Sequence, residues 1–358
     1  MQKITERLTT TSAWAASSTL AGVDLPRTGF ITELRIRAKI TATLTATANP
    51  DGPRRVLDGL QIAGDNRTFL GLTGNINLGT LLALMNLADY GVSGLHANLD
   101  VDATSFDQSY VFHPGSYPRN RFDTSVVIPA RALAQLQVKV NAPAATVVDA
   151  NGEITAGTYY YEVDVVKDLP ITKNTMMPAG YPMVWSNDAN YPAFGKEIDV
   201  PAGGYLRRIV IMALDDTATA PLRKDDQITG VKLYMPKSSK VVIESNWEEL
   251  KAATARRYGI VGDAEPVALG AIDTTRPGYN GAMHLPAGFV IIDLRDYVDA
   301  SENPLGPVYG LNLIGGNGYT PQTGDFKLGL TIENQTPGDK TIIFWDIVVP
   351  VDPTWIGK

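Results

Sequence analysis

The amino-acid sequence predicts an all-β protein built from two similar domains in tandem. Turn-forming residues are abundant, since the chain has 33 glycines and 23 prolines in 358 residues. Thr, Val, Ile and Tyr recur in short runs, which is the composition favoured in strands. The third observation is an internal repeat: one pattern occurs twice, and each copy is long enough to form a domain.

The repeat begins with a turn that leads into a strand. Residues 24–38 and 199–213 share the pattern D-[LV]-P-x-x-G-[FY]-[IL]-x-x-[LI]-x-I-x-A, and the two copies lie 175 residues apart. Pro and Gly specify the turn, and the alternating apolar residues after them predict a strand with one buried face. We expect Leu34 in the first copy and Ile209 in the second to lie on that face.

Four further blocks follow in the same order in both copies. The pairs are residues 57–62 and 228–233, residues 77–90 and 246–258, residues 128–130 and 285–287, and the closing strands 136–140 and 158–166 with 328–332 and 341–349. Chance similarity between β-rich segments would not keep five blocks in one order. The blocks therefore predict a duplicated fold.

The second of these further blocks predicts one helix in each copy, because both versions end in Tyr-Gly. Gly91 and Gly259 stand where a left-handed residue commonly ends a helix. Asn246 and Glu249 fit a capping box, with Asn in the position usually held by Ser or Thr.

The order of short strands, Gly/Pro turns and one helix favours a β-sandwich in each copy. About eight strands per copy suit a jelly roll, which limits exposed strand edges by packing two sheets face to face. An immunoglobulin-like Greek key stays open on the sequence alone. We therefore predict two tandem jelly-roll β-sandwiches, each with a short inserted helix. The predicted division is an N-terminal arm at 1–20, a first jelly roll at 21–170, a linker at 171–196 and a second jelly roll at 197–358, with a long loop at about 288–326.

Bulk composition excludes several classes of protein. The formal net charge is −7 and no basic block occurs, so we expect no direct binding of nucleic acid. The chain has no cysteine, which excludes disulfide scaffolds, thiolate metal sites and cysteine nucleophiles. No apolar run approaches the roughly 18 residues of a membrane span.

Candidate chemistry is sparse. Asn98, Asp100 and Asp102 alternate in a way that could begin a calcium site. The loop lacks a glycine at its sixth position, where Ala103 stands, and ends in Ser109 instead of glutamate, so a solvated polar turn is the simpler interpretation. The three histidines His96, His113 and His284 have no metal-ligand spacing. We expect no catalytic residues and no cofactor.

Over about residues 20–358 the chain shows features of a known protein family. These features are the duplicated D-[LV]-P-x-x-G-[FY]-[IL] turn, the chain length and the strand–helix–strand order. The chain resembles the double jelly-roll major capsid proteins of tailless icosahedral viruses, bacteriophages included, many of which enclose a membrane. The resemblance implies a homotrimer with a pseudo-hexagonal outline that tiles the viral shell. It places the protein in the virion after synthesis in the host cytoplasm. Implied partners are further copies of the chain, minor capsid or vertex proteins, and an internal viral membrane.

Two other functions remain open on the sequence. A carbohydrate-binding or carbohydrate-cleaving protein on two sandwiches would use exposed aromatic rings and carboxylates. The tryptophans available for it are Trp14, Trp185, Trp247, Trp345 and Trp355. A trimeric viral spike or tail component would share the predicted oligomeric state.

Overall fold

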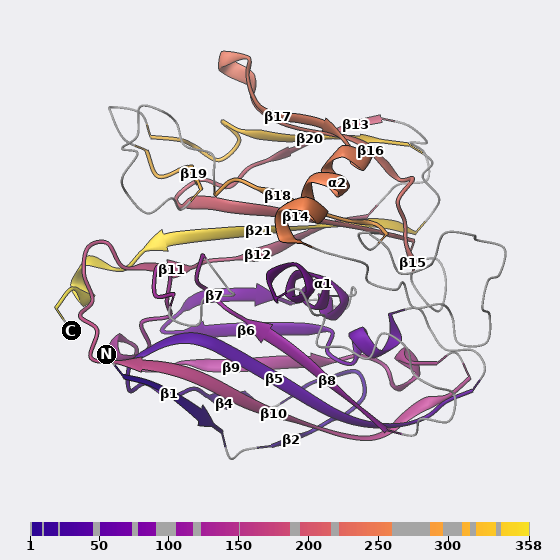
Figure 1. Ribbon diagram of the computed structural model, residues 1–358, viewed down its shortest axis with the longest axis vertical. Coiled ribbons are helices and arrows are strands. Elements are labelled where there is room, and N and C mark those ends of the chain that lie inside the picture. Colours follow the sequence, from indigo (N-terminus) through magenta and orange to yellow (C-terminus); the bar gives the residue numbers. More distant parts are fainter. Residues whose placement is uncertain are drawn as a thin grey trace. The chain divides into compact units, whose positions relative to one another are not determined.

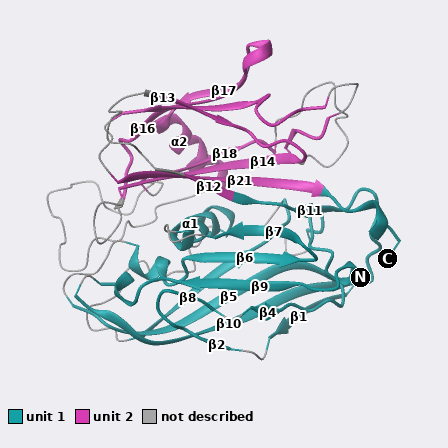
Figure 2. Ribbon diagram, turned by 180° about the vertical axis from the view of Figure 1, so that it is seen from behind, with its two compact units in different colours: residues 1–181, 261–282, 350–358 teal, residues 182–260, 283–349 magenta. Residues whose placement is uncertain are grey.

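The computed structural model describes residues 2–8, 11–20, 22–45, 51–73, 78–90, 105–116, 123–149, 151–186, 194–215, 222–259, 287–295, 310–315, 320–333 and 338–357 (Figure 1). The chain divides into two compact units, coloured separately in Figure 2. Unit 1 comprises residues 1–181, 261–282 and 350–358, and unit 2 comprises residues 182–260 and 283–349.

Unit 1 contains two sheets. The first has the order β1-β10-β5-β8, with antiparallel neighbours, and the second has the order β4-β9-β6-β7. The strands of the first are β1 (Gln2–Arg7), β10 (Glu153–Lys167), β5 (Phe30–Thr43) and β8 (Ser105–Phe112), with β2 (Ser12–Ala13) also beside β10. The strands of the second are β4 (Val23–Asp24), β9 (Gln137–Ala142), β6 (Gly59–Gly64) and β7 (Arg67–Leu72), with β3 (Ser18–Thr19) also beside β9.

Unit 2 repeats this arrangement. Its first sheet has the order β12-β21-β14-β18, and its second has the order β13-β20-β16-β17. The strands of the first are β12 (Tyr181–Ser186), β21 (Asp339–Pro350), β14 (Tyr205–Asp215) and β18 (Phe289–Asp293), with the short β15 (Leu222–Arg223) and β19 (Leu311–Asn312) also beside β14. The strands of the second are β13 (Phe194–Asp199), β20 (Lys327–Ile332), β16 (Ile228–Met235) and β17 (Lys240–Asn246).

The connectivity is that of a jelly roll in both units. Numbered along the chain, the eight principal described strands of each unit form one sheet in the order 1-8-3-6 and another in the order 2-7-4-5. This is the double Greek key of a jelly roll. The predicted fold class is therefore confirmed, and the immunoglobulin-like alternative is excluded.

Each unit carries its helix between the fifth and sixth strands, α1 (Leu78–Tyr90) in unit 1 and α2 (Trp247–Tyr258) in unit 2. The predicted capping box of α2 is present, because Asn246 Oδ1 accepts from the Glu249 N–H at 2.8 Å and the Glu249 carboxylate accepts from the Asn246 N–H. Gly259 ends the helix in the left-handed conformation, with φ 61°. Gly91 and Asn77, at the predicted ends of α1, lie outside the described residues.

Short elements complete the description. They are β11 (Met176–Pro178) and the 3₁₀ turns η1 (Gly52–Arg55), η2 (Ala130–Ala132), η3 (Ala145–Val147), η4 (Pro236–Ser238) and η5 (Pro353–Trp355). No helix in the described part of the chain is long and apolar enough to cross a membrane.

The alternating strand residues build the cores as the repeat predicts. Leu34 and Ile36 are buried in unit 1, and Ile209 and Ile211 are buried in the core of unit 2. Burial of each such side chain contributes about 1.5–3 kcal/mol of hydrophobic free energy. The same cores fix which side chains of each strand face outward.

Two segments predicted as non-core regions supply principal strands. Residues 2–7, within the predicted arm, form β1 beside β10. Residues 289–293, at the start of the predicted long loop, form β18 beside β14. Neither β1 nor β18 lies within a sequence block that the two copies share. The repeat therefore did not reveal these strands.

Candidate functional site

The predicted calcium residues Asn98, Asp100 and Asp102 lie outside the described residues, as do His96 and His284. Calcium binding there stays a prediction. Within the described ranges, no three His, Asp or Glu side chains gather in a geometry that could hold a metal ion.

The remaining histidine stabilises a turn. His113 is buried, and its Nδ1 accepts from the backbone N–H of Gly115 at 3.0 Å. Hydrogen bonds between a polar side chain and a backbone group a few residues away commonly stabilise turns. His113 is therefore part of the local structure that follows β8.

The tryptophans whose side chains the structure describes do not provide a platform for sugar rings. Trp247, Trp345 and Trp355 are buried, and the indole N–H of Trp247 donates to Asp225. Trp14 is half-buried, and its N–H donates to the Val56 carbonyl at 3.3 Å. The side chain of Trp185 lies outside the described residues. The described tryptophans thus hold the fold together.

The outer faces of two sheets offer broad polar surfaces in the described part of the chain. We call the outward side of the β1-β10-β5-β8 sheet the β5 face. It presents Arg7, Arg35, Arg37, Lys39, Asp107, Thr158 and Glu162. Because side chains alternate along a strand, the three basic residues on β5 point to one side while Ile36, Ala38 and Ile40 enter the core.

Ion pairs hold most carboxylates of the β5 face beneath its basic groups. Arg35 bonds Asp164 at 2.8 Å and Glu162 at 3.2 Å, and Lys3 reaches Asp164 at 3.0 Å. Burial works to raise the pKa of Asp164, but hydrogen bonds from Arg35, Thr5 and Lys3 outweigh it and hold the pKa below its ordinary value. Asp164 is therefore ionised at neutral pH, and its charge is compensated within the face.

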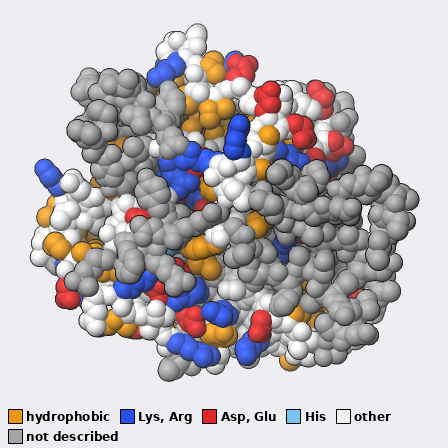
Figure 3. All heavy atoms as spheres, in the orientation of Figure 1, with side chains coloured by type: hydrophobic (Ala, Val, Ile, Leu, Met, Phe, Trp, Pro, Cys, Tyr) orange, Lys and Arg blue, Asp and Glu red, His pale blue; other side chains and the backbone are white. Residues whose placement is uncertain are grey.

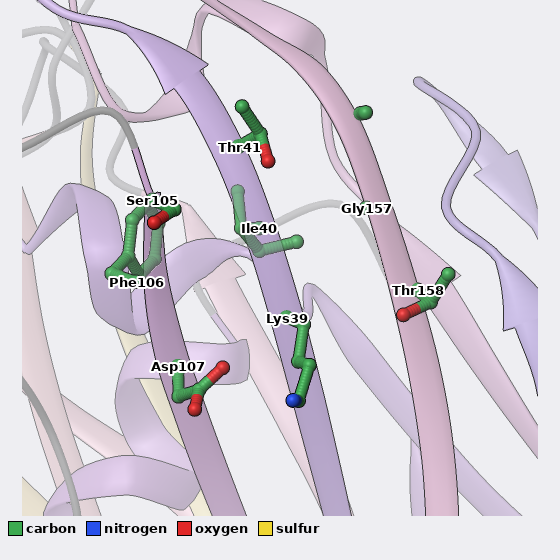
Figure 4. A pocket seen from close by; sticks show the side chains of 9 residues that line it. Lys39, Ile40, Thr41, Ser105, Phe106, Asp107, Gly157 and Thr158 are labelled. Atoms are coloured by element: carbon green, nitrogen blue, oxygen red, sulfur yellow. The ribbon is translucent and has the colours of Figure 1, made fainter.

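An open hollow of about 670 Å³ lies on the same face, across β8, β5 and β10 (Figure 4). Figure 4 shows Lys39 between Asp107 on β8 and Thr158 on β10, which agrees with the strand register. Neither Lys39 nor Asp107 forms an ion pair with another described residue. These groups can therefore meet a binding partner without breaking an internal contact.

The second surface is the outward side of the β13-β20-β16-β17 sheet in unit 2, which we call the β16 face. It presents Gly195, Glu197, Asp199, Lys232, Tyr234, Glu244, Lys327, Gly329 and Thr331. Lys232 pairs with Glu244 at 3.0 Å, and Lys327 pairs with Asp199 at 2.7 Å. A hollow of about 590 Å³ lies on this face.

Small residues shape that hollow. Thr331 stands between Gly195 and Gly230 in the strand register, so three adjacent strands present little side chain at this level. Beside them, Tyr234 crosses toward β13 and donates its hydroxyl hydrogen to Glu197. That hydrogen bond to a carboxylate raises the pKa of the Tyr234 hydroxyl.

Both surfaces are suited to contact with another macromolecule. They are open, span several strands and carry paired charges, whereas small-molecule and catalytic sites are enclosed and converge on a few polar groups. Sequence reasoning missed both faces. The strand alternation could have identified the row Arg35, Arg37 and Lys39, but not which strands lie beside it.

Comparison with known proteins finds no matching family model and no matching curated protein. Solved structures do match over the whole chain. The STIV major capsid protein, from Sulfolobus Turreted Icosahedral Virus, superposes with a TM-score of 0.66 and 15% sequence identity, covering 98% of this chain and 97% of that one. The major capsid protein P2 of bacteriophage PM2 gives a TM-score of 0.56 at 11% identity, covering 99% and 100%. The PBCV-1 virus capsid protein gives 0.55 at 9% identity, covering 97% and 93%.

Because these superpositions extend over nearly all of both chains, they include both jelly rolls and not one sandwich alone. The agreement persists at identities where sequence comparison detects nothing, so it concerns the fold. The chain has the double jelly-roll fold of these viral major capsid proteins.

Proposed function

We propose that this chain is a structural major capsid protein that forms pseudo-hexameric trimers and tiles an icosahedral viral shell. The observation that carries the proposal is the whole-length structural likeness to the STIV and PM2 major capsid proteins. The proposed place of the protein is the virion, and its role is mechanical and not enzymatic.

The duplicated fold supports this role physically. Each chain has two jelly rolls with the same connectivity, so a trimer contains six similar sandwiches. Six similar sandwiches around one axis have an approximately hexagonal outline. Hexagonal tiles cover a surface with few gaps. A ring of three identical chains also closes with one repeated contact between unlike surfaces.

Further copies of the chain are the proposed main partners. Contacts with minor capsid or vertex proteins and with an internal viral membrane are proposed from the same likeness. We propose no direct contact with nucleic acid: the net charge is −7, and Figure 3 shows charges of both signs interspersed among the coloured residues of one side. The division into 1–20, 21–170, 171–196 and 197–358 stays a proposal, and so do contacts made by the segments 1–20 and about 288–326 outside the strands β1 and β18 that they contain.

The test combines mass and shape. Light scattering of the purified chain should give about three times the 38.6 kDa mass of one copy. Electron microscopy of that species should show a compact pseudo-hexagonal outline. A monomer at every accessible concentration would overturn the proposal, and an elongated trimer would support a spike or tail component instead.

A further inference from the structure

We infer that the β5 face of one copy docks on the β16 face of a second copy. The inference rests on the proposed capsid function and deepens it by naming the surfaces that join neighbouring chains. The contact is heterologous, because two different faces of the same chain meet.

The two faces expose charges of opposite sign. On the β5 face the basic partner of an ion pair is the more exposed one: the side chain of Arg37 is 47% exposed and that of Glu162 is 20% exposed. On the β16 face the order is reversed. Glu244 is 63% exposed against 39% for Lys232, and Asp199 is 55% exposed against 29% for Lys327. Each face thus shows the sign that the other would attract.

The remaining charges of the β5 face keep this difference. Lys39 and Asp107 are exposed side by side in the strand register and offset one another, whereas the acidic Asp164 lies beneath Arg35 and Lys3. Arg7 lies 4.4 Å from the centre of the Tyr160 ring, which holds one more guanidinium on this side of the sheet. An incoming carboxylate would meet an ordered basic surface.

The β16 face also offers apolar area to a protein partner. Val241 is 42% exposed and lies beside Tyr234 in the register of β16 and β17. On the same face, Gly195, Thr331 and Gly230 on three adjacent strands leave a hollow that long side chains of a partner can enter. Arginine and tyrosine are enriched in protein interfaces because they combine large contact area with hydrogen bonding.

A second copy explains why both faces occur on one chain. A heterologous contact uses one face on each side and closes into a ring when its rotation allows. Three such contacts would satisfy all six faces of a trimer. Complementary charges at this contact would also disfavour pairing of two β5 faces or two β16 faces, because like charges repel.

Charge exchange tests this contact in the full chain. Arg37→Glu and Glu244→Lys should each weaken the trimer at least tenfold in dissociation constant. In the chain that carries both substitutions, the acidic and basic sides of the contact are exchanged and attract each other again. This variant should therefore recover most of the lost trimer affinity. Lys173→Glu and Glu248→Lys make the same charge changes on a turn and on α2, outside both faces, and should leave the trimer unchanged. Native mass spectrometry and light scattering supply the readout.

The outcomes separate this inference from the capsid proposal. A monomeric wild type overturns the proposed function itself. A trimeric wild type that tolerates Arg37→Glu and Glu244→Lys overturns only the contact, as does failure of the doubly substituted chain to recover. If circular dichroism shows that a reversed variant is unfolded, Arg37→Gln and Glu244→Gln decide, and a folded trimer of wild-type affinity in both would reject the contact.

Discussion

Thr32 and Arg207 hold the same position in the two jelly rolls: each is the residue at which the third strand bulges away from the eighth. In unit 1 the pairing passes from Glu33–Asp164 to Ile31–Val165 and skips Thr32. In unit 2 it passes from Arg208–Asp346 to Leu206–Ile347 and skips Arg207. The two bulged residues lie 175 positions apart, which is the offset of the sequence repeat.

The shared bulge serves a different charge arrangement in each unit. In unit 1 the Thr32 hydroxyl donates to the Asp164 carbonyl at 3.3 Å. In unit 2 the bulge brings two successive arginines to one carboxylate, with Arg207 and Arg208 each 2.7 Å from Asp346. A bulge redirects side chains, and here it allows two neighbours to reach the same group.

Loss of Asp346 should therefore be costly. Asp346→Asn removes the charged carboxylate that both buried guanidinium groups contact, so we expect the free energy of unfolding to fall by about 3–5 kcal/mol in denaturant titration. Glu248→Gln removes an exposed carboxylate from the first turn of α2, outside both faces, and should change stability by less than about 1 kcal/mol. Equal effects of the two substitutions would contradict this account.

The same carboxylate should make stability depend on acid. Burial works to raise the pKa of Asp346, but the charges and hydrogen bonds of Arg207 and Arg208 outweigh it, and the pKa lies below its ordinary value of 3.8. As the pH falls, Asp346 therefore binds a proton in the unfolded chain before it does so in the folded chain. The stabilisation that Asp346 provides above pH 3.8 then declines until the pH has fallen below the pKa of the folded state. Asp346→Asn should show a shallower fall as the pH drops below 3.8 in acid unfolding curves. Curves of identical slope would show that Asp346 is not responsible.

Gly79 permits the close approach of α1 to the preceding loop. A Cβ at this position would lie 1.6 Å from the Leu57 carbonyl oxygen and 2.7 Å from that of Arg54. Alanine normally improves a helix by about 1 kcal/mol over glycine, but here the clash should reverse the sign and destabilise by about 2 kcal/mol or more. Gly22→Ala is the control, since a Cβ there meets only the flexible side chains of Gln137 and Lys139, at 3.3 Å and 3.4 Å. A stabilised Gly79→Ala variant in thermal melts would refute the close contact.

The cap of α2 can be tested with two substitutions of one residue. Asn246→Ala removes the acceptor for the Glu249 N–H and should lower the free energy of unfolding by about 1 kcal/mol. Asn246→Asp keeps an acceptor and adds a charge that the helix N-terminus favours, so it should retain wild-type stability. If both variants melt with the wild type, the cap contributes nothing measurable.

Much of the fold could be read from local patterns. The Pro-Gly turn before β5 and β14, the alternation at Leu34 and Ile209, and the capping box at Asn246 are all short-range features, and the structure confirms them. Alignment of the closing strands was the least exact part. Val163 pairs with Leu34 and Trp345 pairs with Ile209, so β10 and β21 correspond with an offset of 182 and not the 183 that the matched runs 158–166 and 341–349 imply.

The sequence by itself determined that the chain is duplicated, all-β and supplied with one helix per copy, because turns, caps and alternation act between residues close along the chain. Only the tertiary structure decided the strand order, the roles of β1 and β18, and the paired bulges at Thr32 and Arg207. It also decided which sign of charge is more exposed in the ion pairs of the β5 and β16 faces. These features depend on which distant strands become neighbours. Packing and hydrogen bonding across the sheet determine these neighbours, and the sequence of a single strand does not specify them.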